Sequence, residues 1–407
     1  MTLPGAPAIR RIDRRLRILG TEVSLIEPIR HHAEADLGLS LEFEVLDFQN
    51  CEHKAATAPD SYDIYDQCFH NLDIVWFWGA LQSIDTQRIA DWDHVSPLTR
   101  EGRISKFASP GYGDRPVSRL YVQPNGFLGP VPSRHVAMLP TVHNFDSFGF
   151  DRRVFDAVDP EGASWALLLS PRADGRAALV DEPAIGLLDA ALAAEASGAM
   201  CFGDLGNLTV AEIDALMALL EDRRRQGHFR CLWRTADQAA ELVRGGSVSV
   251  QSMWSPAYGG LGAMGDSFVE AVPAEGYRAW HGGLALARHL QGAPLDMAYE
   301  YLNWWLSGCA GAIMARRGYY MSVPERVRQS VSPQEWAYWY EGRPAEIDLP
   351  DPFGQTAVRA GSRRPGGGYW NRARHVAVWN SAMDEHNYAA RAWARFGRAM
   401  RQGGACP

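Results

Sequence analysis

Aromatic residues stand beside short polar residues at several points of this 407-residue chain. Four clusters have this form, and each follows an apolar run: Tyr65-Asp66-Gln67, Trp254-Ser255-Pro256, Trp280-His281-Gly282 and Gly318-Tyr319-Tyr320. An aromatic face next to a carboxylate binds an organic cation, at roughly 0.5–2 kcal/mol for each ring removed from water. A single ring of this kind is better explained as core, but the four clusters together indicate a ligand-binding site.

Other kinds of site find less support. Gly260 to Gly265 match a dinucleotide-binding fingerprint, but the strand-like run 268–272 follows where that motif needs a helix. The adjacent His31 and His32 cannot point the same way from a helix, and no HExxH or HxxxH pair occurs. A GxSxG nucleophile elbow is also missing. We therefore expect no metal site and no cofactor.

The elements that must position these clusters begin with a strand, a helix and a second strand. Leu16–Gly20 alternates like a strand, 26–37 carries helix formers, and the apolar positions between Leu39 and Val45 alternate with polar ones. A second such region contains a buried strand at 177–180 and a helix at 184–196. Alternating units of this sort predict an α/β protein with a mainly parallel sheet flanked by helices.

Helix boundaries are best marked in the second half of the chain. Thr209 with Glu212, and Ser332 with Glu335, predict capping boxes at two helix starts. The stretch 346–369 is rich in Pro, Gly and charge and predicts a surface loop. Trp393, Phe396 and Met400 share one face of a terminal helix, which we expect to dock onto the body of the protein.

Length, net charge and cysteine spacing limit the possible architecture and partners of the protein. A chain of 407 residues exceeds the roughly 250–300 residues of a single core, so two lobes are expected. With 40 basic and 48 acidic residues the formal net charge is −8, which is unsuited to nucleic acid. Six cysteines form no CxxC pair; buried free thiols, or bridges Cys51–Cys68 and Cys201–Cys231 in an oxidising compartment, both fit the spacing.

The chain resembles the spermidine/putrescine-binding protein family, the extracellular receptors of ABC-type importers. The likeness runs nearly from end to end. The segments that carry it, in the family's order, are 19–22 (LGTE), 62–67 (YDIYDQ), 79–85 (GALQSID), 140–149 (PTVHNFDSFG), 252–256 (SMWSP), 273–280 (PAEGYRAW) and 318–320 (GYY).

The resemblance implies a two-lobed type II periplasmic-binding fold that holds its ligand in the cleft between the lobes. One lobe would consist of 14–143 plus 281–325 and the other of 144–280 plus 326–403, with crossings near 143–148 and 279–283. Lobe closure would then be read by an ABC permease in the inner membrane. We expect a monomer without catalytic residues.

The family's cleft residues, carried over motif by motif, give the candidate ligand-binding set. It consists of Thr21, Glu22, Tyr65, Asp66, Gln67, His70, Asn144, Asp146, Ser147, Asp181, Glu182, Trp254, Ser255, Trp280, His281 and Tyr319. Two carboxylates of the family's polyamine binders are missing, because Gly282 and Ile185 occupy their positions. A buried ammonium without its partner is costly, so a polyamine and a smaller or differently charged organic ligand both stay open.

The alternative is an enzyme of transferase type on the same bilobal fold, since a fold does not fix an activity. Cys68, beside Asp66 and His70, is the only thiol next to the expected cleft. A receptor of an importer works outside the inner membrane, so the expected location is the periplasm. The first 20 residues contain no apolar export stretch, so either the protein is cytoplasmic or an export signal lies outside this sequence.

Overall fold

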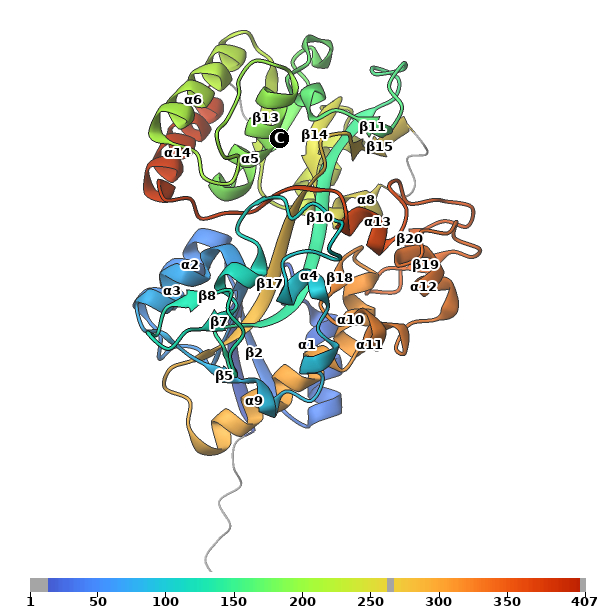
Figure 1. Ribbon diagram of the computed structural model, residues 1–407. Coiled ribbons are helices and arrows are strands. Elements are labelled where there is room, and N and C mark those ends of the chain that lie inside the picture. Colours follow the sequence, from blue (N-terminus) through green and yellow to red (C-terminus); the bar gives the residue numbers. More distant parts are fainter. Residues whose placement is uncertain (1–13, 262–266, 403–407) are drawn as a thin grey trace, which may run out of the picture.

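The computed structural model describes residues 14–261 and 267–402. Two halves, one above the other in Figure 1, are joined by the long strands β10 (Leu139–Asp151) and β17 (Tyr277–Ala287). The two-lobed α/β fold predicted from the sequence is confirmed. Gly262 to Gly265 of the glycine-rich motif, Cys406 and residues 1–13 lie outside the described residues.

One mixed sheet of 13 strands runs through both halves along the path β13-β12-β14-β10-β17-β3-β1-β2. β1 pairs in parallel with β2 and β3 in the lower half, and β12 pairs in parallel with β13 and β14 in the upper half. The strands of this path, besides β10 and β17, are β1 (Arg15–Gly20), β2 (Ser40–Val45), β3 (Ile64–Cys68), β12 (Ala177–Val180), β13 (Phe229–Trp233) and β14 (Val250–Met253). Strands beside the path are β4 (Leu81–Gln82), β6 (Tyr112–Gly113), β15 (Phe268–Glu270), β18 (Tyr320–Met321) and β21 (Val376–Trp379).

The strand β10 changes partner midway, which is where the chain passes between the halves. Asn144 to Asp146 pair with β17, whereas Ser147 to Phe150 pair with β14. Side chains at this change of partner therefore lie between the two halves.

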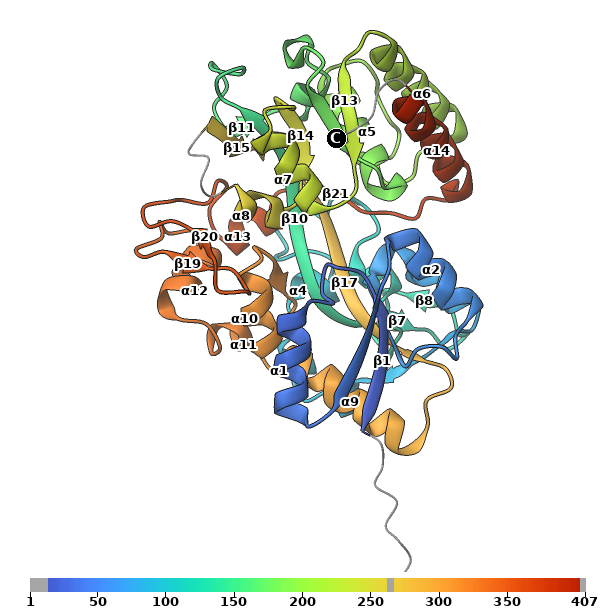
Figure 2. The ribbon, with the colours of Figure 1, turned by 180° about the vertical axis from the view of Figure 1, so that it is seen from behind.

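Helices cover both halves (Figure 1 and, from behind, Figure 2). In or beside the lower half are α1 (Glu27–Leu37), α2 (Phe48–Thr57), α3 (Leu72–Phe77), α4 (Pro97–Arg100), α9 (Gly292–Leu306), α10 (Cys309–Ala315), α11 (Pro324–Arg328) and α12 (Pro333–Trp339). The upper half carries α5 (Pro183–Ala196), α6 (Val210–Arg225), α7 (Ala236–Arg244) and α14 (His386–Gln402), and α8 (Ser255–Gly260) and α13 (Tyr369–Ala373) lie at the level between the halves. Both predicted capping boxes, Thr209 with Glu212 and Ser332 with Glu335, are confirmed.

Three small sheets complete the fold of the described residues. One contains β5 (Ile84–Asp85), β9 (His135–Val136), β7 (Tyr121–Val122) and β8 (Leu128–Gly129), and the others pair β11 (Glu161–Ala163) with β16 (Val272–Pro273) and β19 (Leu349–Pro350) with β20 (Thr356–Val358). The expected surface loop 346–369 thus contains a strand pair. It also contains Arg364, which is only 4% exposed, so the prediction of a surface loop is wrong there.

Separate apolar cores fill the two halves. The first draws on the segments 16–145 and 277–379, and it includes Tyr369 and Trp379. A second core draws mainly on 148–271 and on the terminal helix, where the predicted face of Trp393, Phe396 and Met400 is buried. A third cluster around Trp254 lies on the other side of the upper sheet. The side chains between these cores form the candidate site.

Candidate ligand-binding site between the halves

A hydrogen-bonded group at the partner change of β10 joins three of the sequence clusters. Asn144 lies opposite Trp280 in the β10–β17 register. The indole Nε1 of Trp280 donates to Asp146 Oδ2 at 2.8 Å, and Asn144 Nδ2 donates to Asp146 Oδ1 at 2.8 Å and to Ser255 Oγ at 2.7 Å. The ring of Tyr319 meets that of Trp280 edge-on, with 5.3 Å between centroids. Residues from three of the four sequence clusters are thereby brought together with Asn144 and Asp146.

Sequence reasoning missed the cation at the centre of this group. Arg278, fully buried, places Nε 2.6 Å from Asp189 Oδ1 and Nη2 3.6 Å from Asp146 Oδ2, and its Nη1 donates to Asn380 at 3.0 Å. Burial raises the pKa of Asp146 to about 6 although the Arg278 charge opposes the shift. One feature of the sequence could have revealed it: Arg278 stands inside a strand of small and aromatic residues, where a charged side chain needs a buried ion-pair partner.

Asp66 lies in the middle of β3, opposite Gly20 at the end of β1. Gly20 is required there because a Cβ on it would lie 2.7 Å from the carbonyl oxygen of Asp66. The Asp66 side chain is 3% exposed, and burial raises its pKa to about 7, with the Ser24 hydroxyl opposing the shift. Within residues 14–261 and 267–402 its Oδ2 has no hydrogen-bond partner. A carboxylate oxygen held in this way needs a cationic or hydrogen-bonding partner.

Glu182 provides a second such oxygen from the other half, at the start of α5. Burial raises the pKa of its carboxyl to about 8, although the amides of Ile185 and Ala184 at the helix end lower it. The charge of Glu52 raises the pKa of Glu182 further. As for Asp66, the part of the chain that is described offers no hydrogen-bond partner to the buried Oε2 of Glu182.

Glu52, on α2, was not predicted as a site residue. Burial raises its pKa to about 7. Nothing in the sequence distinguishes it from other helical glutamates, because only the packing of the two halves brings it near Glu182. One turn earlier on the same helix, the ring of Phe48 meets that of Trp254 edge-on at 6.4 Å, and Trp254 also packs against Trp233 at 4.8 Å.

Some predicted residues have partners within the protein. Asp181 pairs with Arg234 at 2.8 Å and with Arg401 at 3.1 Å, and the hydroxyl of Ser147 donates to the carbonyl of Ala271 at 2.8 Å. The ring nitrogens of His281 lie 2.9 Å from Thr99 Oγ1 and 2.9 Å from the carbonyl oxygen of Gly282. Their contact with a ligand stays a prediction.

The remaining predicted residues differ in exposure. Tyr65 is fully buried and packs against Tyr62 in the lower half. Thr21, Gln67 and His70 are buried, and burial lowers the pKa of His70 to about 3. Glu22 is exposed and faces the charges of Arg317 and Asp237, from the lower and upper halves. It therefore marks the rim of the interface between the halves.

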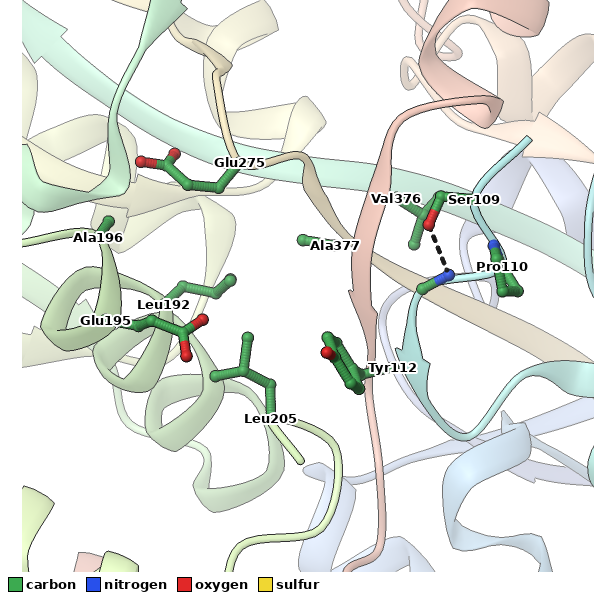
Figure 3. Close-up of a pocket in the computed structure, with 11 residues that line it drawn as sticks. Ser109, Pro110, Tyr112, Leu192, Glu195, Ala196, Leu205, Glu275, Val376 and Ala377 are labelled. Atoms are coloured by element: carbon green, nitrogen blue, oxygen red, sulfur yellow. Dashed lines mark hydrogen bonds between the residues drawn. The ribbon is translucent and has the colours of Figure 1, made fainter. Parts of the chain in front are cut away.

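Two cavities lie elsewhere in the molecule. One of about 690 Å³, shown in Figure 3, is lined by 109–112, by Leu192, Glu195, Ala196, Leu205 and Glu275, and by Val376 and Ala377. Another of about 800 Å³ lies beside α9, where Arg88 pairs with Asp296 at 2.7 Å. Neither contains a predicted site residue. In the first cavity Glu195 accepts from the amide of Phe202 and Glu275 from that of Trp165, so both acids already have partners.

Across the described ranges, 14–261 and 267–402, no group of three or more His, Cys, Asp or Glu side chains is arranged to hold a metal ion. None of the helices there combines the length and apolar character that a bilayer crossing requires.

Two lobes joined by crossing strands, with polar and aromatic side chains between them, define the type II periplasmic-binding fold. No protein-family model matches the chain, and no curated protein matches its sequence. Solved structures do match.

A protein of Listeria monocytogenes provisionally described as a spermidine/putrescine ABC transporter has a TM-score of 0.65 at 13% identity, covering 94% of this chain and 98% of its own. PotD, the spermidine/putrescine substrate-binding protein of Streptococcus pneumoniae, has a TM-score of 0.60 at 12% identity, and the match covers 95% of this chain and 99% of PotD. A structure described as a GABA receptor has a TM-score of 0.57 at 13% identity, and the match covers 95% of this chain and 97% of that one. At these identities the likeness establishes the fold, and it confirms the resemblance predicted from the sequence at that level.

Proposed function

We propose that this chain is the solute-binding receptor of an ABC importer and that it captures an amine-bearing organic cation by closure of its two lobes. The observation that carries the proposal is a pair of carboxylate oxygens from opposite halves, Asp66 Oδ2 and Glu182 Oε2, which are buried without a hydrogen-bond partner among the described residues. The rings of Trp254, Trp280 and Tyr319 would supply the aromatic faces of the site. Carboxylates and aromatic faces together favour an ammonium group over an anion.

The solved structures do not choose between ligand classes, since their names include both spermidine/putrescine and GABA. These ligands differ in charge. A ligand carboxylate among desolvated Asp and Glu side chains would be repelled, whereas an ammonium would be paired. Charge therefore favours an amine without an acidic group.

A matched pair of small molecules tests the ligand class. The probes 1,4-diaminobutane and 4-aminobutanoate have nearly the same length and differ at one end in charge. We expect the diamine to raise the melting temperature of the protein and the amino acid to leave it unchanged, because a ligand that binds only the folded state stabilises it. Tighter binding of 4-aminobutanoate would refute the proposal. Closure of the lobes is measured on the same samples as a ligand-dependent fall in the radius of gyration.

The enzyme alternative depends on Cys68. Burial raises the pKa of this thiol, and the carboxylates of Glu182 and Asp66 raise it further. A nucleophilic cysteine needs the opposite environment, because the thiolate is the reactive form. This residue therefore lends the alternative no support.

Partner, location and lobe boundaries belong to the same proposal. A receptor of this kind delivers its ligand to an inner-membrane permease from the periplasm, and adjacent permease and ATPase genes would support the assignment. The boundaries given from the sequence stay a prediction. The packing of Tyr369 and Trp379 with the first core favours a return of the chain to the second lobe near residue 380 rather than 326.

A further inference from the structure

One face of α2 is directed at the opposite lobe. Phe48 and Glu52 are four residues apart, so they share a side of the helix. Phe48 packs against both the first core and the cluster around Trp254 in the other half. Glu52, one turn further along, therefore lies at the boundary between the lobes.

Glu182 lies on the other side of that boundary. It precedes α5, whose residues belong to the upper half, and its buried Oε2 has no hydrogen-bond partner among the residues that the structure describes. The Glu52 charge is one of the causes that raise the pKa of Glu182, and burial raises the pKa of both. Ile185, in the first turn of α5, belongs to the cluster around Trp254 that Phe48 packs against, so Glu52 and Glu182 approach the same part of the boundary from opposite lobes.

The basic side chains around this group have other partners. Lys54, two residues after Glu52, pairs with Glu44 at 2.5 Å. Arg278 is near enough to lower the pKa of Glu182, but its guanidinium is already paired with Asp189 and Asp146. Ionised carboxylates that approach without a cation repel each other, and the repulsion opposes closure of the lobes.

Resting on the proposed function, we propose that Glu52 and Glu182 hold one ammonium group of the ligand between them, so that the ligand's own charge removes a repulsion that otherwise opposes lobe closure. Each lobe supplies one carboxylate, and the bound cation completes the contact. The subsite takes a primary ammonium group, whose three N–H donors can reach acceptors on both sides. Glu52 is then a specificity-determining residue that the family motifs do not contain.

The test uses Glu52→Gln, Glu182→Gln, the double variant, and Glu325→Gln as control. Glu325 is exposed on α11, so its substitution changes the net charge equally without touching the cleft. Two quantities are measured at pH 8: the melting temperature without ligand and the affinity for 1,4-diaminobutane by calorimetry.

We expect each cleft variant to bind the diamine at least tenfold more weakly than wild type, and to melt at the same or a higher temperature without ligand. The double variant should lose about as much affinity as a single one, because both carboxylates hold the same group. The control should behave as wild type. Loss of a merely structural contact would instead lower the melting temperature, so the two readouts distinguish the roles.

Affinity of Glu52→Gln within twofold of wild type would overturn the proposal. A fall in both affinity and ligand-free melting temperature would overturn it as well, since the residue would then support the fold. Failure of the wild type to bind any amine would refute the proposed function itself. The melting temperatures measured without ligand test the repulsion between the two carboxylates independently of any binding.

Discussion

Replacement of Trp280 tests both the fold and the proposed ligand contact. The side chain is 6% exposed, its Nε1 donates to Asp146 Oδ2 at 2.8 Å, and its ring meets Tyr319. In Trp280→Ala the lost packing costs about 3–5 kcal/mol of unfolding free energy. One good ring contact with a cation is worth roughly 0.5–2 kcal/mol, and about 1.4 kcal/mol corresponds to a tenfold change in affinity. A tenfold fall in affinity needs a contribution from the upper half of this range, which one well-placed ring can supply, and we expect a fall of that size.

Trp280→Phe separates the ring from its hydrogen bond. Phenylalanine keeps an aromatic face but cannot donate to Asp146, which leaves that oxygen with Arg278 at 3.6 Å. We expect this variant to lose about 1–3 kcal/mol of stability and to bind the amine within a few fold of wild type. Urea denaturation gives the stability, and calorimetry with 1,4-diaminobutane gives the affinity. A folded Trp280→Ala protein with unchanged affinity would remove this ring from the site.

Three further outcomes are expected. Arg278→Met should cost about 3–5 kcal/mol in urea denaturation, because two buried carboxylates lose their shared cation; a smaller cost would show that they are solvated. Iodoacetamide at neutral pH should modify the exposed Cys201 and spare Cys68, as read by mass spectrometry, and rapid alkylation of Cys68 would revive the enzyme alternative. Because burial raises the pKa of Asp66 to about 7 and of Glu182 to about 8, the folded protein retains protons that the unfolded chain has released, so unliganded stability should fall as pH rises from about 5 to 8. Binding of a cation favours the ionised carboxylates, so the rise in melting temperature given by 1,4-diaminobutane should grow over this interval; a stability independent of pH would contradict the pKa shifts.

Local pattern was enough to find most of the regular elements. β1 and α1 follow from alternation and from Pro28 and Gly38 at the helix ends, and the box of Thr209 and Glu212 starts α6 as predicted. These signals lie within a few residues of what they specify.

The segment 346–369 shows where local pattern fails. Its composition is typical of a loop, yet Arg364 is buried and donates to Tyr320 Oη at 3.0 Å and to Ser255 Oγ at 3.1 Å. Partners 44 and 109 residues away stabilise the buried guanidinium, and no window of sequence contains them. The burial of an arginine therefore cannot be predicted from local sequence, because its acceptors come together only in the folded protein.

By itself the sequence determined the α/β class, the order of the motifs and the residue types of the site, which are indole rings, phenol rings and acids. Only the tertiary structure decided which acids face the boundary between the lobes. Asp181 and Glu182 are neighbours in the chain, yet Asp181 is bound by Arg234 and Arg401, whereas one oxygen of Glu182 has no hydrogen-bond partner among the described residues and feels the charge of Glu52. The physical reason is that consecutive side chains leave an extended backbone in opposite directions, and what each one meets depends on elements far away in the sequence.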